Sequence, residues 1–452
     1  MSLHFASAYP GGMSFDSFDQ YGQSINKNYF SHHPPLMSMV WSLFHYIYQG
    51  PQTMLLLNLG LLWGGVLLLF YADSQNKYRW LYLLIPFLPN ILSQSGTIWK
   101  DVAFAFGSFF VVATCIFYTY RRKPASLLVV IGLLSIVFYI VGVKFQAQFI
   151  APILILFVLS IYLKTSLLIR IILTCIISLL IIYGNAKLTK HFSTESHSEQ
   201  LRQLFDIAGV SVAINNDDLV PKYVKEDQDL YSFEKLKVHY TPRWVDPLIF
   251  ADTRIYASTA DPIKLQEMES AYKQAITHYP LDFLKHRTMN FVMLMKNWGF
   301  HHYAFIELNE AQKHGMDIKK NYLKNWTIKY LKLYPKILTI NLISFILIFV
   351  YLSIITNKQS NSPEKVILAY IVAISIVFSI VLFFATMASD YRYYYVIRIL
   401  TLFSLPIYLK FRQSKNGVIA RRHEPTKQSI KVIKNGLLRR CIAAPRNDVS
   451  SF

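Results

Sequence analysis

A short N-terminal stretch carries the residues best suited to chemistry. Asp16 and Asp19 stand one helical turn apart beside Gln20, and His32 and His33 follow in the run Ser-His-His-Pro-Pro-Leu. A carboxylate of this kind can accept the proton of an attacking hydroxyl, or help to hold a divalent cation against a phosphate. The alternative is an acidic loop in which Asp16 or Asp19 caps a helix.

Three further motifs supply positive charge. Lys100 and Asp101 end a Trp-Lys-Asp motif, Lys144 precedes Phe-Gln, and Arg392 lies between Asp-Tyr and a run of tyrosines. Lysine and arginine side chains neutralise phosphates, and Asp101 could bind a metal or support a ligand. The alternatives are an interfacial tryptophan with Asp101 at a helix N-terminus, and an aromatic belt in which Arg392 makes one salt bridge.

The composition indicates which elements must position these residues. Of 452 residues, 53% are hydrophobic and 16% charged, and the mean hydropathy is +0.31, which is too apolar for a soluble enzyme of this length. The net charge of +20 comes mainly from short loops and the C-terminal tail, as in membrane proteins, so nucleic acid is not an expected partner. The sequence predicts an all-α polytopic membrane protein.

Apolar segments of suitable length predict nine spans. Lys and Arg then gather on one side, which the positive-inside rule makes cytoplasmic. The candidate site residues all fall on the outer side. The segment Leu36–Tyr48 is too short to span and is predicted to be interfacial or re-entrant. The predicted spans are 52–73, 80–95, 102–120, 125–142, 147–163, 166–185, 336–356, 365–387 and 393–411.

This topology divides the chain into five regions. The region between the two groups of spans is rich in charge, Tyr and His, and it is long enough to form a mostly helical soluble domain. Near its end, Trp298, His301 and His302 either touch substrate or form a surface cluster. The regions are an outer loop 1–36, a transmembrane block 37–186, the soluble domain 187–335, a second block 336–411 and a basic cytoplasmic tail 412–452.

The sequence lacks the motifs of soluble nucleotide enzymes. It contains no Walker lysine motif, no G-x-S-x-G and no zinc-type cysteine cluster. Charged residues are also scarce within the predicted spans, whereas ion-coupled transporters usually bury several there. Both observations favour chemistry at the outer membrane surface.

The outer-face motifs resemble those of C-type (GT-C) glycosyltransferases. The loop Ser-x-Asp16-Ser-x-x-Gln20, the following His-Pro-Pro, the Trp-Lys-Asp loop and the late Asp-x-Arg-Tyr element occur in the order found in RgtA/B/C/D-like and DUF6020-type proteins. The likeness covers roughly residues 9–400, through short motifs. It implies a GT-C-like helix bundle with a soluble domain on its outer face.

The resemblance also implies roles. Asp16, with Asp19 as substitute, would be the catalytic carboxylate, and Asp101 would assist or bind a metal. The remaining candidates would bind substrate: Gln20, His32, His33, Lys100, Lys144 and Arg392. The donor would be a polyprenyl-phosphate-linked sugar and the acceptor a cell-envelope glycan or lipid, at the periplasmic face of a bacterial inner membrane. A divalent cation, Mg or Mn, is left open, with Asp16 and Asp101 as its ligands.

Two features depart from the family pattern. Family members have a spanning helix before the first loop, so we expect either an upstream start or translocation of the 36 N-terminal residues. The basic tail has no counterpart. Two alternative functions remain open: an O-antigen ligase or polymerase-like enzyme using a pyrophosphate-linked donor, and a lipid or glycan transporter.

Overall fold

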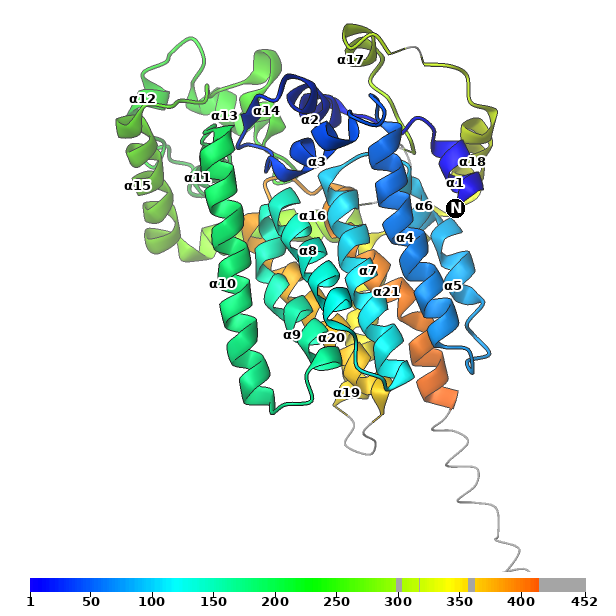
Figure 1. The fold of residues 1–452 in the computed structure, drawn as a ribbon. Helices are drawn as coiled ribbons and strands as arrows, with labels where there is room; N and C mark the ends of the chain where they lie inside the picture. The colour runs from blue at the N-terminus through cyan, green and yellow to red at the C-terminus, as the bar shows by residue number, and fades with distance from the viewer. Residues whose placement is uncertain (298–302, 317, 357–361, 414–452) are drawn as a thin grey trace, which may run out of the picture.

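The computed structural model describes residues 1–297, 303–316, 318–356 and 362–413. In these ranges the protein is almost entirely helical, as predicted (Figure 1). Its two strands, β1 (Tyr29–Phe30) and β2 (Ser193–Thr194), form one short parallel pair. Trp298, His301 and His302, and the tail from residue 414, lie outside the described residues.

Within the described ranges, five helices are long and apolar enough to cross a membrane, and three shorter apolar helices run beside them (Figure 1). This arrangement is compatible with the predicted multi-pass membrane protein. The five are α4 (Gln52–Ala72), α7 (Lys100–Arg121), α10 (Leu167–Phe192), α20 (Pro363–Ala385) and the segment Tyr391–Gln413, which contains η5 (Tyr391–Tyr394) and α21 (Tyr395–Phe403). The shorter helices are α8 (Leu127–Val143), α9 (Ala151–Tyr162) and α19 (Asn341–Ile355).

The prediction of one spanning helix across residues 80–95 is wrong. That segment divides into α5 (Leu81–Leu84), η1 (Ile85–Phe87) and α6 (Pro89–Ser95). Proline lacks an N–H group and its ring disfavours a helical conformation in the preceding residue. Leu88, just before Pro89, accordingly takes an extended conformation with φ −62° and ψ 137°. Pro89 thus interrupts the helix in this apolar run.

Helix α7 forms the centre of the bundle. In its most apolar window 78% of the residues are buried, compared with 17% for α10 at the periphery. Helix α4 packs along α7, with Phe109 lying against Gly65. Because α7 is held on several sides, its N-terminal residues Lys100 and Asp101 have a fixed position.

The N-terminal segment contains two helices, α1 (Ser2–Ala8) and α2 (Phe15–Asn26). Ser14 and Ser17 form a reciprocal capping box that fixes the start of α2. Helix α2 ends at Lys27, which takes a left-handed conformation with φ 53°. Helix α3 (Leu36–Phe44) follows, and at nine residues it is too short to span a bilayer.

The region between α10 and α19 has two parts. Helices α11 (Glu199–Ile214), α15 (Pro262–His278) and α16 (Pro280–Lys296) surround a separate hydrophobic core that includes Phe205 and Met268. After α16, side chains such as Tyr303 and Leu331 join the core of the bundle instead. Shorter elements complete the fold: η2 (Phe145–Phe149), α12 (Lys222–Lys225), α13 (Phe233–His239), α14 (Asp246–Ile249), η3 (Ala251–Thr253), α17 (Leu308–Lys313), α18 (Tyr322–Leu333) and η4 (Lys336–Thr339).

Candidate functional site

Segments that are distant in the sequence meet at the end of the bundle below α2. The first turn of α2 carries Asp16, the first turn of α7 carries Lys100 and Asp101, the C-cap of α8 is Lys144, and η5 carries Arg392. These five side chains are linked by ion pairs or by electrostatic interactions. We call this group the charged cluster.

Arg392 lies at the centre of the charged cluster. Its Nη1 is 2.8 Å from Oδ2 of Asp16, and its Nε is 3.1 Å from Oδ2 of Asp390 and 3.8 Å from Oδ2 of Asp101. The guanidinium also lies over the Trp99 ring, 5.0 Å from its centroid. A planar guanidinium with several fixed donors suits such a position, where it would also bind a phosphate.

Asp101 and Lys144 form the buried part of the charged cluster. The two side chains are in direct contact and only 2% and 4% exposed, respectively. The Lys144 ammonium also lies 4.9 Å from the centroid of the Tyr393 ring. Burial of two charges is tolerated here because each compensates the other.

His33 contacts the charged cluster at Lys100. Lys100 Nζ lies 2.8 Å from His33 Nδ1. Because an ammonium only donates, the neutral His33 ring accepts at Nδ1 and carries its proton on Nε2. That Nε2 is 3.9 Å from both Oδ1 of Asp16 and Oδ2 of Asp19. Burial, together with the charge of Lys100, lowers the pKa of His33 well below its ordinary range.

The electrostatics favour an ionised Asp16. Burial alone would raise the pKa of its carboxyl, but the charge of Arg392, assisted by that of Lys100, outweighs this effect and lowers the pKa. Asp16 is therefore a carboxylate at neutral pH. It is also accessible, with 35% of its side chain exposed.

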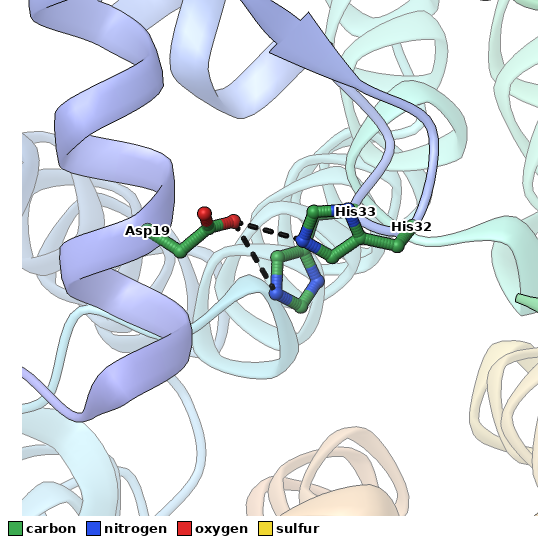
Figure 2. Close-up of side chains that lie close together, drawn as sticks. All are labelled: Asp19, His32 and His33. Atoms are coloured by element: carbon green, nitrogen blue, oxygen red, sulfur yellow. Dashed lines mark hydrogen bonds and ion pairs between the residues drawn. The ribbon is translucent and has the colours of Figure 1, made fainter. Parts of the chain in front are cut away.

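Asp19 and His32 form a second, more exposed group with His33 (Figure 2). Asp19 Oδ2 accepts hydrogen bonds from His32 Nε2 at 2.9 Å and from Gln23 Nε2 at 2.6 Å. One oxygen and two ring nitrogens lie within 4.8 Å of one another, a donor set suited to zinc or another transition metal rather than magnesium. The hydrogen bond from Lys100 to His33 opposes such binding, since it keeps the proton on Nε2.

The residues predicted to hold a cation, Asp16 and Asp101, do not form a magnesium site. Asp16 is paired with Arg392, and the buried Asp101 is paired with Lys144. Magnesium requires several free oxygen ligands in octahedral geometry. Two carboxylates already neutralised by side-chain cations do not provide them.

Gln20 is the predicted site residue that lies apart from these groups. It is 1% exposed, and among the described residues its Nε2 has no hydrogen-bond partner. Gln20 follows Asp16 by four residues on α2, but its side chain is enclosed by the protein. Its predicted contact with substrate is not supported by this geometry.

One acidic residue near the charged cluster gave no signal in the sequence. Asp246 begins α14, in the region between α10 and α19 that we call the inserted region. The charges of Arg392, Asp16 and Asp390 all act on it. Burial is the main effect and raises the pKa of its carboxyl. A single acid within a charged insert has no local pattern that would mark it, and only the tertiary fold brings it to this place.

The inserted region also makes hydrogen bonds to the segment that precedes Arg392. Ser389 N donates to Arg243 O at 2.7 Å, and Val245 N donates to Met387 O at 3.0 Å. The buried Arg287 of α16 donates to the carbonyl oxygen of Thr386 and to the carboxylate of Asp206. The position of Arg392 therefore depends on contacts with the inserted region.

A cavity of about 500 Å³ adjoins the charged cluster between α8 and α10. Pro34, which follows His33, and Phe145, which follows Lys144, both line it. Its wall is apolar at Val141 and Ile182 and carries three charged residues, Lys190, Glu195 and Glu199. The cavity thus offers apolar and charged surfaces beside the charged cluster.

Comparison of the chain with family models, with curated proteins and with solved structures gave no match.

Proposed function

We propose that this protein is a membrane glycosyltransferase that transfers a sugar from a polyprenyl-phosphate carrier to a cell-envelope glycan or glycolipid. The observation that carries the proposal is the meeting of an accessible carboxylate, Asp16, with the cations Lys100, Lys144 and Arg392 at one end of an apolar bundle. The resemblance of these motifs to those of GT-C enzymes supports the same reaction. The site would face the periplasm of a bacterial inner membrane.

The carrier lipid would occupy the cavity between α8 and α10. Its apolar wall at Val141 and Ile182 suits isoprenoid units, and Lys190 is the lining residue that would meet an anionic group, although Glu195 and Glu199 line the cavity too. The phosphate would then lie near Lys144, since Phe145 next to it lines the same cavity. Most of the apolar part of α10 is exposed, and we propose that the carrier lipid would reach the cavity from that side.

The transfer would occur in one displacement. The acceptor hydroxyl attacks the anomeric carbon, its proton passes to Asp16, and the bond between that carbon and the phosphate oxygen breaks. The electron pair leaves on the polyprenyl phosphate, whose negative charge the charged cluster stabilises. A single displacement inverts the anomeric configuration, so retention in the product would contradict it.

No step of the proposed transfer requires a metal ion. Arg392 and the two lysines supply the positive charge that a divalent cation supplies in other phosphate sites. Asp19, His32 and His33 are the residues with a suitable donor set, should a cation bind.

The test is transfer of radiolabelled sugar from polyprenyl phosphate in membranes that contain the protein. Asp16→Asn should lose transfer, whereas Asp229→Asn, a change at an exposed acid in the inserted region, should retain it. Transfer only from a pyrophosphate-linked donor would favour the ligase or polymerase alternative. Movement of intact donor across the membrane without a new glycosidic bond would indicate a transporter.

A further inference from the structure

A second cleft lies along one face of α2. It has a volume of about 480 Å³ and is bounded by one face of α2, the segment at Asn28 and Phe30, and helix α17. Asp19 lines this cleft and lies one turn of α2 beyond Asp16. Residues three apart on a helix share a face, so the cleft begins beside the proposed catalytic carboxylate.

The lining of this cleft combines aromatic rings with hydrogen-bonding groups. Phe15 is 64% exposed at its edge, and His314 stacks on Phe18 with ring centroids 5.6 Å apart. Asn28 and Glu310 add amide and carboxylate groups. Flat rings pack against the apolar faces of sugars, and amides and carboxylates bind their hydroxyl groups.

The charges of the cleft select against phosphate. No lysine or arginine is among its described lining residues, whereas two acids, Asp19 and Glu310, are. The nearby Lys313 is already paired with Glu310 at 2.6 Å. An anionic lipid headgroup would therefore meet acidic side chains here and no lining lysine or arginine among the described residues.

The orientation of Asp19 links the cleft to the chemistry. Hydrogen bonds from His32 and Gln23 hold its Oδ2, and 41% of its side chain remains exposed. A sugar hydroxyl bound by Asp19 would place the next part of the acceptor within a helical turn of Asp16. The acceptor would then lie along α2 and the donor in the cavity between α8 and α10.

We propose that this cleft binds the acceptor, and that the acceptor is an uncharged, hydroxyl-rich glycan rather than an anionic lipid. The inference rests on the proposed function and specifies its second substrate. It assigns Phe15 and Asn28 to acceptor binding and Asp19 to holding the acceptor hydroxyl near Asp16.

The experiment measures two reactions of the same radiolabelled polyprenyl-phosphate donor: release of sugar to water without acceptor, and transfer to the neutral glycolipid fraction extracted from envelope membranes. In Phe15→Ala and Asn28→Ala we expect the glycolipid concentration for half-maximal transfer to rise about tenfold, as expected for loss of an aromatic or hydrogen-bonding contact. Tyr322→Ala removes a ring that is 76% exposed and lines a different cleft, and it should leave this concentration unchanged.

The outcomes separate the two proposals. An unchanged glycolipid dependence in both cleft variants, with the donor still consumed, would overturn the acceptor site and leave the transferase standing. Equal transfer to vesicles of phosphatidylglycerol that lack glycan would overturn the choice of an uncharged glycan. A wild-type protein that consumes no donor, with or without glycolipid, would overturn the proposed function and with it the acceptor site.

Discussion

Arg392 Nη1 lies 2.8 Å from Oδ2 of Asp16, and this contact joins the last segment of the bundle to the N-terminal helix α2. The same guanidinium reaches Asp390 through Nε at 3.1 Å. One planar group therefore fixes two carboxylates at once. A flexible ammonium could not make both contacts in this geometry.

Arg392→Lys should consequently lower the rate of sugar transfer by about 100-fold, the usual effect of removing one preorganised donor from a developing anion. The charge stays, but the fork that holds Asp16 is lost. Steady-state transfer kinetics measure the effect, which should fall mainly on kcat. The variant Asp390→Asn keeps the guanidinium of Arg392. If it lowered the transfer rate as much as Arg392→Lys does, Asp390 would be as important for transfer as Arg392.

The pH dependence of transfer should change when Arg392 loses its charge. Burial raises the pKa of Asp16, and Arg392 is the strongest of the charges that lower it. In wild type Asp16 therefore stays ionised, and transfer should not fall between about pH 7 and pH 5 through this group. Arg392→Gln leaves the effect of burial less opposed, so the acid limb should move to higher pH. Asp390→Asn preserves the guanidinium charge and should not move the limb upward.

The sequence predicted much of the site because each part lies at a recognisable boundary. Lys100 and Asp101 begin an apolar helix and Lys144 ends another, so the spans alone placed them at a common end of the bundle. The pairing within this group was not predictable. Whether Asp101 meets Lys144 or Arg392 depends on how α7 and α8 rotate, which hydrophobic periodicity barely specifies for helices apolar all round.

Other features could not be read from local patterns. The segment 80–95 has the hydropathy of a span, but it is divided into shorter helices, with a break just before Pro89. The composition of the inserted region shows no boundary within it. Tyr303 and Leu331 nevertheless pack against the bundle, whereas Phe205 belongs to a separate hydrophobic core. Long-range packing makes this division, because charge and polarity are similar on both sides of it.

The buried pair of Asp101 and Lys144 should dominate local stability. Asp101→Asn or Lys144→Met alone leaves one uncompensated charge in a site only 2% to 4% exposed, and should lower the free energy of unfolding by about 3–5 kcal/mol. The double variant removes both charges and should recover most of this loss. Thermal unfolding of the purified protein in detergent measures all three. A double variant as unstable as the sum of the single ones would show that the pair is not coupled.

The inserted region should control transfer through Arg287. Its guanidinium joins the Asp206 carboxylate to the carbonyl of Thr386, just before the segment that ends in Arg392. Arg287→Lys retains a charge for Asp206, but a single ammonium lacks the fork that reaches both partners. We expect a rise of the donor KM by about tenfold, because a small displacement of Arg392 weakens phosphate binding before it removes the base.

Arg202→Gln provides the matched control. Arg202 also approaches Asp206, at 3.9 Å, but its side chain is 29% exposed and belongs to the opposite helix α11. If Arg287 acts by positioning Arg392, Arg202→Gln should leave the donor KM unchanged, although it too alters the surroundings of Asp206. Equal effects of the two variants on the donor KM would mean that Asp206 acts only by stabilising the hydrophobic core of the inserted region. A raised KM in Arg287→Lys with normal thermal unfolding would instead place the link to Thr386 within the binding of the donor.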